Sequence, residues 1–247
     1  IDTVSGGSAT ESGTQSKTIT INDTNDLPNV TLSASGGSVA ENGADLSVKV
    51  SLSKTTTENV IVTLVSSGTA TSGSDYAALS TITIPAGSQS AAVAFNPTVD
   101  GVYENGGVAE TAIFDIQSVS GGSAVENATP QQVTISITEN ESAPTVTLSG
   151  TASSVEEDSS GTITLTATLS VATSADVTVV LAASGTSTEG TDYANLSGIT
   201  ISAGSLTGTT TFDPTNDNTY EGDETAIIAI DTVSGGSATE SGTQSKT

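Results

Sequence analysis

Acidic side chains fall at matching places in the two halves of this chain, where predicted strands end. The first set is Glu41, Asp75, Asp100, Glu104, Glu110 and Glu139, and the matching set is Glu157, Asp192, Asp217, Glu221 and Glu224. Carboxylates that are packed together repel one another unless they are protonated or bind a cation. Hard oxygen donors with loose geometry suit calcium better than magnesium, and zinc prefers His or Cys. The pattern predicts a calcium site in each half.

The two halves are copies of one unit, and the copying reaches both ends of the chain. Residues 1–18 (IDTVSGGSATESGTQSKT) recur unchanged as residues 230–247. Inside this long repeat, the segment that begins at Pro28 is similar to the one that begins at Pro144. Self-similarity at a fixed spacing is typical of tandem-repeat architectures. The unit is about 115 residues long, a common size for one domain.

The repeat divides the chain into three predicted parts. Residues 1–27 correspond to the end of a preceding unit, 28–143 to a complete unit, and 144–247 to a second unit. In residues 1–27, the shared eighteen residues are followed by the strand-like segment 19–27 (ITINDTNDL), so we expect the second unit to lack its last strand. An unpaired strand edge recruits strands from other chains. End-to-end strand exchange between molecules is therefore expected.

Apolar residues alternate with polar ones through both units, which predicts strands that are half buried in a sheet. The clearest runs are Leu46, Val48, Val50 and Leu52 in one unit and Ile163, Leu165, Ala167 and Leu169 in the other. About seven such strands per unit indicate an all-β fold of tandem immunoglobulin-like antiparallel β-sandwiches. The high net charge would favour disorder as the alternative, but sustained alternation argues against it. The four tyrosines, and Phe95 with Phe212, fall at repeat-equivalent positions, so we expect them to be packing and hydrogen-bonding residues and not to bind a ligand.

The charge balance restricts the partners. The chain has 28 acidic residues, four lysines, no arginine and no histidine, for a net charge of −24. Nucleic acid and anionic membranes are excluded as partners because both require a cationic face. Ordinary solvation is the alternative explanation for any single acid, and it is favoured for Asp45, Glu58 and Asp115, which have no matched partner.

The composition also argues against catalysis. Without histidine or cysteine, a serine or cysteine nucleophile has no evident base. A pair of carboxylates could in principle cleave glycosides, but the chain has no tryptophan to stack on a sugar ring. We therefore expect a protein that is not an enzyme. The absence of cysteine leaves bound metals as the means of stabilising such a chain outside the cell.

Several motifs together resemble the Calx-beta domain over nearly all of both units. They are Gly73-Ser74-Asp75-Tyr76, Gly190-Thr191-Asp192-Tyr193 and Tyr220-Glu221-Gly222-Asp223-Glu224-Thr225. The family includes calcium-binding modules of sodium/calcium exchangers and repeats in large bacterial surface adhesins of the RTX type. Exchanger domains carry a run of aspartates where this chain has Phe95-Asn96-Pro97 and Phe212-Asp213-Pro214, so the number of ions per unit is left open.

The resemblance implies where calcium would bind. Its ligands would be the early Glu (Glu41, Glu157), the Asp before Tyr (Asp75, Asp192), and the acids of the loop before the penultimate strand (Asp100, Glu104 and Glu110; Asp217, Glu221 and Glu224). Acids after the last strand would complete the set, namely Asp23 and Asp26 at one junction and Glu139 and Glu141 at the next. Residues 23–28 (DTNDLP) are also similar to the calcium-binding linker of cadherins, which implies ions that stiffen the array.

These features together predict a calcium-rigidified extender of a large bacterial surface adhesin that acts in cell adhesion or biofilm formation. Its expected location is extracellular, secreted or attached to the cell surface. Its expected partners are calcium ions and the neighbouring repeats of the same chain. The alternative is a calcium-dependent module that binds a host or matrix glycan or protein. Such a module would be expected to interrupt the repeat with long loops or exposed aromatic residues.

Overall fold

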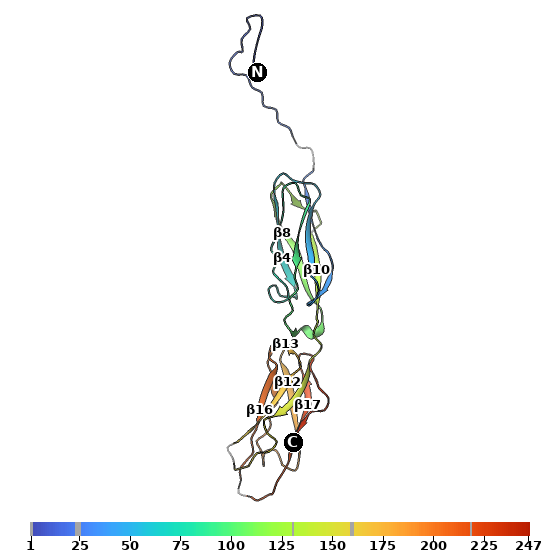
Figure 1. The fold of residues 1–247 in the computed structure, drawn as a ribbon, viewed down its shortest axis with the longest axis vertical. Coiled ribbons are helices and arrows are strands. Elements are labelled where there is room, and N and C mark those ends of the chain that lie inside the picture. The colour runs from blue at the N-terminus through green and yellow to red at the C-terminus, as the bar shows by residue number, and fades with distance from the viewer. Residues whose placement is uncertain (1, 23–25, 130, 159–160, 218) are drawn as a thin grey trace.

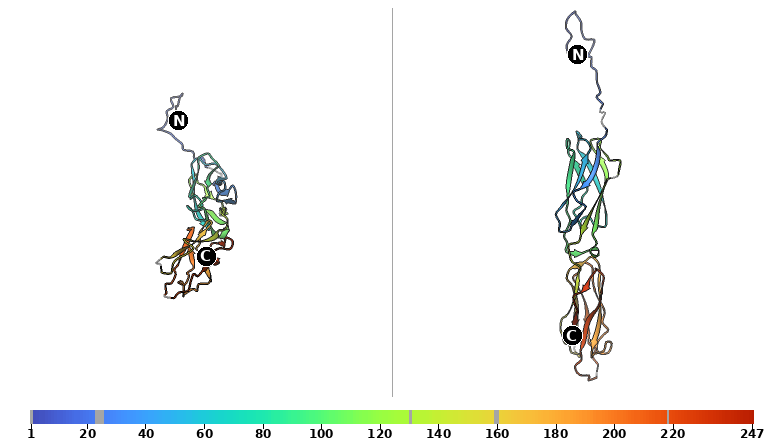
Figure 2. Two further views of the ribbon diagram at one scale, coloured as in Figure 1. Left: turned by 60° about the horizontal axis from the view of Figure 1, so that its bottom comes forward. Right: turned by 90° about the vertical axis from the view of Figure 1, so that its right-hand side faces the viewer.

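The chain forms two β-sandwiches that follow one another along a single long axis (Figures 1 and 2). The computed structural model describes residues 2–22, 26–129, 131–158, 161–217 and 219–247. The described residues before Pro28 form no strand and extend away from the first sandwich, at the end opposite the second (Figure 1). No helix in the described ranges is long and apolar enough to cross a lipid bilayer.

The first sandwich, hereafter the first repeat, packs two sheets face to face. One sheet has the order β6-β3-β1-β9, and the other has the order β2-β10-β8-β4-β5. Their strands are β1 (Asn29–Ala34), β2 (Ser38–Ala40), β3 (Leu46–Leu52), β4 (Val60–Gly68), β5 (Thr81–Ile84), β6 (Ser90–Phe95), β8 (Glu110–Ser120), β9 (Val125–Glu126) and β10 (Gln132–Thr138). The seven longer strands pair antiparallel, while the short strands β2 and β9 pair parallel with β10 and β1.

The second sandwich, hereafter the second repeat, has the same plan with one difference. Its sheets have the orders β16-β12-β11-β18 and β15-β14-β17-β19. The strands are β11 (Thr145–Gly150), β12 (Ile163–Leu169), β14 (Val177–Gly185), β15 (Ile199–Ile201), β16 (Thr207–Phe212), β17 (Ala226–Ser234), β18 (Thr239–Glu240) and β19 (Ser245–Lys246). The two-residue strand β19 lies beside β17, where β10 lies beside β8 in the first repeat. The all-β tandem-sandwich fold expected from the sequence is confirmed.

The predicted alternation produces the two cores. Val48, Val50 and Leu52 of β3 face inward, and Lys49 between them faces solvent. The first core is centred on stacked Tyr76 and Phe95, whose ring centroids lie 5.1 Å apart. Their counterparts Tyr193 and Phe212 lie 4.7 Å apart in the second repeat. Buried aliphatic and aromatic side chains on both inner sheet faces supply most of the favourable free energy of such a fold.

A short parallel bridge joins the repeats. β7 (Val102–Tyr103) of the first repeat pairs with β13 (Ala172–Thr173) of the second, and the Ser174 N–H donates to the Tyr103 carbonyl at 3.1 Å. The loop after β7 carries a 3₁₀ turn (Asn105–Gly107), which occupies the place of a three-residue difference between the copies. The loop that precedes the penultimate strand of one repeat is thus also the surface on which the next repeat docks.

Candidate metal centre

Two parallel strands bring the first group of acids together. Glu41 directly follows β2, and Glu139 directly follows β10, its neighbour in the sheet. The Glu41 N–H donates to the Thr138 carbonyl at 3.1 Å, which continues the pairing to the point where both chains leave the sheet. Glu141 lies two residues further on. One carboxylate oxygen from each of Glu41, Glu139 and Glu141 lies within 4.8 Å of the others, and we call this group the junction cluster.

A second group lies on the loops beside it. Asp75 ends a tight turn in which its carboxylate accepts the Thr71 N–H, Glu104 follows β7, and Glu110 begins β8. Their oxygens also lie within 4.8 Å of one another, and we call this group the loop cluster. The turn is held against the sandwich because the Ala70 N–H donates to the Thr111 carbonyl at 3.0 Å. Strand ends far apart in sequence therefore meet at one end of the repeat, as sandwich topology predicts.

The two clusters are in contact. The Glu104 N–H donates to Glu139 Oε2 at 2.6 Å, so a backbone group of the loop cluster binds a carboxylate of the junction cluster. Asp100, whose Oδ1 accepts the Val102 N–H at 2.8 Å, acts electrostatically on both Glu41 and Glu104. The junction cluster and the loop cluster therefore form one continuous acidic region at this end of the first repeat.

The electrostatic consequence is a strong preference for protons or cations. Burial, followed by repulsion from Glu139, Glu141, Asp100 and Glu104, raises the pKa of Glu41 from 4.5 to about 8. Burial and the surrounding carboxylates likewise raise the pKa of Glu104 and of Glu110 to about 7. Two charges about 4.8 Å apart repel by about 3 kcal/mol at an effective dielectric constant of about 20. Several such pairs would cost much of a typical folding free energy of about 5–15 kcal/mol.

Oxygen atoms without partners show what kind of ligand the region fits. Glu41 is only 7% exposed, yet its Oε2 has no hydrogen-bond partner, and neither have Glu141 Oε2 and Asn140 Oδ1. Buried polar atoms are nearly always paired, because an unpaired one costs about 1–3 kcal/mol. All three are acceptors, so a donor or a cation is what they lack. A donor set of carboxylate and amide oxygens fits calcium, which binds oxygen ligands in flexible geometry.

The second repeat carries a looser version of the loop cluster. Oxygens of Asp192, Glu221 and Glu224 lie within 4.8 Å of one another, and we call this group the distal cluster. The Asp192 carboxylate accepts the Thr188 N–H, as Asp75 accepts that of Thr71. Asp217 and Glu157 help to raise the pKa of Glu221, after burial and Asp192. Glu221, Glu224 and Glu157 are all exposed, whereas Glu41, the counterpart of Glu157, is buried.

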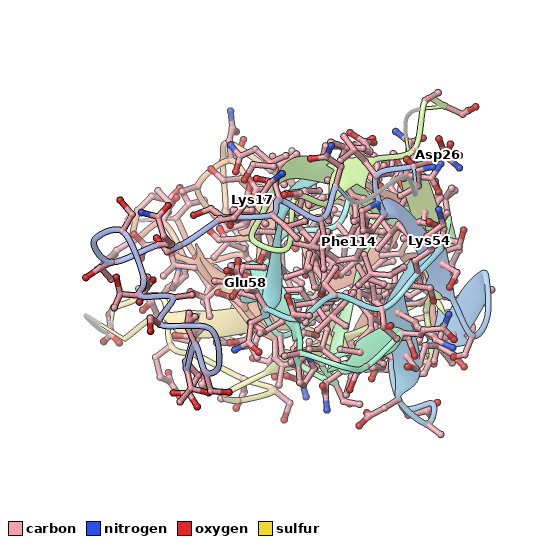
Figure 3. All side chains as sticks on the ribbon, turned by 90° about the horizontal axis from the view of Figure 1, so that it is seen from above. Lys17, Asp26, Lys54, Glu58 and Phe114 are labelled. Atoms are coloured by element: carbon pink, nitrogen blue, oxygen red, sulfur yellow. The ribbon has the colours of Figure 1, made fainter. Side chains whose placement is uncertain are left out.

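The structure brings most of the predicted calcium ligands together, but not all of them. The structure brings together Glu41 and Glu139; Asp75, Glu104 and Glu110; and Asp192, Glu221 and Glu224, with Asp100, Asp217 and Glu157 close enough to influence them electrostatically. Asp26 instead lies exposed at the opposite end of the first repeat, where its backbone oxygen accepts a hydrogen bond from Lys54 Nζ at 3.2 Å (Figure 3). Asp23 lies outside the described residues. Asn140 was missed, although its place between Glu139 and Glu141 was a signal for it.

One further expectation fails. Tyr220 is 96% exposed, so it does not pack as its repeat-equivalent Tyr103 does at 8% exposure. Tyr103 pairs with Thr173 in the β7–β13 bridge and is covered there, whereas no strand among the described residues pairs with Tyr220. The expectation that Tyr220 is a packing residue is wrong, because the second repeat that covers Tyr103 has no counterpart beside Tyr220 among the described residues.

Comparisons with known proteins identify the family of both repeats. The family model described as the Calx-beta domain matches residues 23–141 and again residues 139–246. No curated protein matches the chain. Among solved structures, CBD12 from CALX1.2 is 17% identical with a TM-score of 0.39, over 83% of this chain and 80% of that one. The apo-form Calx CBD1 domain is 18% identical with a TM-score of 0.39, over 47% of this chain and 100% of that one.

Proposed function

Because this chain belongs to the Calx-beta family and gathers unpaired acceptor oxygens where its two repeats meet, we propose that it is a calcium-binding spacer that calcium stiffens. The carrying observation is the buried Glu41 carboxylate, which has one oxygen without a partner and only like charges around it. A calcium ion there would supply the missing partner and remove the repulsion. Glu41, Glu139, Glu141 and Asn140 would hold it, and Asp75, Glu104 and Glu110 would form a second position.

The stiffening follows from what these ligands are attached to. Glu139 and Glu141 lie on the segment that runs from β10 into β11, so an ion bound to them restrains the linker between repeats. Glu104 directly follows β7, which pairs with β13 of the second repeat. One region of bound metal thus restrains both connections between the sandwiches. Without it, repulsion among the acids favours opening of both.

We extend the proposal to a stalk of a large bacterial surface adhesin, outside the cell. Three features support it. A repeated unit, in which residues 1–18 recur unchanged as residues 230–247, serves length better than a unique binding site. Calcium sites in extracellular modules have dissociation constants of about 0.1–1 mM, which suits occupancy outside the cell. The chain also has no cysteine, so stabilisation by metal would replace disulfides.

Thermal unfolding tests the proposal when the same sample is scanned with chelator, with magnesium and with calcium. Calcium is expected to raise the unfolding temperature, and magnesium to do so much less, because magnesium demands stricter geometry and keeps its waters. Small-angle scattering on the same samples should show a broader distribution of maximum dimensions in chelator. Equal scans and equal scattering in all three conditions would refute both the calcium site and the stiffening.

A further inference from the structure

We propose that residues 105–109 determine how the second repeat is oriented against the first, and that an ion at the loop cluster fixes this orientation by holding the two ends of that segment. The ion rests on the calcium-binding function proposed above, but the segment itself contains no acidic residue. The joint consists of β7 and residues 104–110 of the first repeat, together with the part of the second repeat that they contact.

The surface of the second repeat that receives the loop is a shared feature of the unit. Thr173 of β13 is 1% exposed, and it pairs with Tyr103 across the joint. Gly236 packs against it so closely that a β-carbon on Gly236 would lie 2.9 Å from the Thr173 side chain. In the first repeat Gly122 approaches Thr56 in the same way, at 2.7 Å for the equivalent β-carbon. Both copies therefore carry this surface, and nothing in it is particular to the joint.

The loop that meets this surface differs between the copies. Residues 105–109 (NGGVA) separate the two glutamates of the loop cluster, whereas residues 222–223 (GD) separate the two glutamates of the distal cluster. The additional residues form the 3₁₀ turn Asn105–Gly107, and the second repeat has no such turn among its described residues. The loop, and not the surface that receives it, is thus the part of the joint that belongs to the first repeat alone.

Two consecutive glycines fit the loop to the joint. Gly106 and Gly107 have φ angles of 65° and 76°, in the left-handed region that glycine adopts without strain. A β-carbon on Gly106 would lie 3.2 Å from Ser237 Oγ of the second repeat. One on Gly107 would lie only 2.6 Å from the hydroxyl oxygen of Tyr103, the residue that pairs with β13. The loop fills the joint so closely that an added methyl group must displace a neighbour.

The two ends of the loop are where an ion would act on it. Glu104 and Glu110 contribute carboxylate oxygens that lie within 4.8 Å of each other. The Gly107 N–H donates to the Glu104 carbonyl at 2.8 Å, which closes the turn on the same base. Without a cation the two like charges repel and favour an open base. A bound ion would close the base and hold Gly106 and Gly107 against the second repeat.

Two effects of calcium should therefore be separable. Stabilisation depends on the ligands, which a shorter loop keeps. Orientation depends on the residues between them, which a shorter loop lacks. Replacing residues 105–109 by Gly-Asp, the sequence of the equivalent loop, removes the second effect and leaves Glu104 and Glu110 in place.

Spin labels on the two repeats test this separation, because the chain has no cysteine and labelled cysteines can be introduced singly. Lys49→Cys in β3 and Thr209→Cys in β16 occupy exposed positions, and pulsed dipolar spectroscopy measures the distribution of distances between the labels. We expect calcium to narrow this distribution in the chain with its own loop. In the chain with the Gly-Asp loop the narrowing should be lost, while calcium still raises the unfolding temperature.

The outcomes distinguish the two claims. Equal narrowing in both chains would overturn the role of residues 105–109, even if calcium stabilises both. A chain with its own loop that calcium neither stabilises nor narrows would refute the calcium-binding function instead. Loss of the calcium-induced rise in the loop-swapped chain would contradict the separation of binding from orientation.

Glycine substitutions give a second measure that keeps the length of the loop. Gly107→Ala should broaden the distribution with calcium, because the added methyl group must displace the Tyr103 ring beside the bridge. Gly87→Ala is the matched control, since its φ of 78° gives the same backbone strain but nothing lies within 4 Å of its β-carbon. The Gly87 N–H donates to Thr56, which lines a cleft with Pro28 at the end remote from the joint. Gly87→Ala should leave the distribution unchanged, and equal distributions in the two variants would show that the loop does not orient the repeats.

Discussion

The same acidic loops occur at the ends of both repeats, but only those of the first repeat are enclosed. Glu41 is 7% exposed and Tyr103 is 8% exposed, while Tyr220 is 96% exposed and Glu157 lies on the surface. The first repeat has the strand β10 along its edge and a second repeat docked against its loops. The second repeat has neither among the described residues.

This difference shows what makes the candidate metal centre. The acids themselves are encoded in each unit, but the last strand and the next repeat bury them. Burial strengthens each electrostatic interaction by lowering the local dielectric constant. The first repeat should therefore bind calcium more tightly than the second, and the tightest sites of an array should lie at its internal junctions.

The largest expected difference in stability between the two repeats comes from substituting the equivalent tyrosines, Tyr103 and Tyr220. Tyr103→Ala should destabilise the first repeat by about 2–4 kcal/mol, because it removes a buried aromatic ring at the joint. Tyr220→Ala should change stability by less than about 0.5 kcal/mol, since the side chain is exposed. Denaturant unfolding of both variants under conditions that keep the chain monomeric measures the difference. Equal losses would mean that the two ends are equivalent.

The next largest effect is expected when two proposed calcium ligands are substituted together. Asp75→Asn with Glu104→Gln should remove about 1.5–3 kcal/mol of the stabilisation given by about 10 mM calcium. In chelator the same variant should be more stable than the unsubstituted chain, because two repelling charges are gone. Asp192→Asn with Glu221→Gln is the matched control and should lose less. Calorimetric scans with and without calcium measure this loss of stabilisation. An unchanged response to calcium would show that Asp75 and Glu104 are not ligands.

The pH dependence of the metal-free protein should show the same contrast. Folding raises the pKa of Glu41 from 4.5 to about 8 and that of Glu104 to about 7, so the stability tied to their protonation is complete below pH 4.5. That stability is lost as the pH rises through about 7 and 8. In chelator the first repeat should thus be more stable at pH 5 than at pH 8, by about 1–2 kcal/mol after allowance for coupling. With calcium the trend should weaken or reverse, because protons compete with the ion. A flat profile in chelator would contradict the clustered carboxylates.

The smallest effect on stability concerns the bridge. Ser174→Pro removes the N–H that donates to the Tyr103 carbonyl, and it should cost the free energy of unfolding only about 0.5–1.5 kcal/mol. It should nevertheless broaden the distribution of angles between the repeats, even with calcium. Fluorescence energy transfer between dyes on the two repeats measures that distribution. An unchanged distribution would show that the β7–β13 bridge does not orient the repeats.

Sequence alone predicted the fold well, for a physical reason. Alternation such as that of Val48, Lys49 and Val50 has the period of a strand, and two copies of the unit report the same pattern twice. The repeat offsets also showed which acids correspond between the two copies, because residues such as Asp75 and Asp192 occupy equivalent positions.

The joint and the division of the acids into two clusters could not be read from the sequence. The bridge of β7 and β13 contains only two residues on each side, too few for a periodic signal. The contrast between Tyr103 and Tyr220 was hidden for another reason. Identical residues at equivalent positions differ only in what covers them, and that depends on the neighbouring repeat. Asn140 is an amide with no matched acid in the other copy, so the repeated pattern of acids does not mark it.

A crystal structure of the chain grown with calcium tests the central claim most directly. We predict density for an ion between Glu41, Glu139 and Glu141, with Glu41 Oε2 about 2.3–2.6 Å from it and anomalous signal to identify the metal. If those carboxylates instead point away from one another into solvent, with no ion among them at saturating calcium, the junction is not a calcium site and the account is wrong.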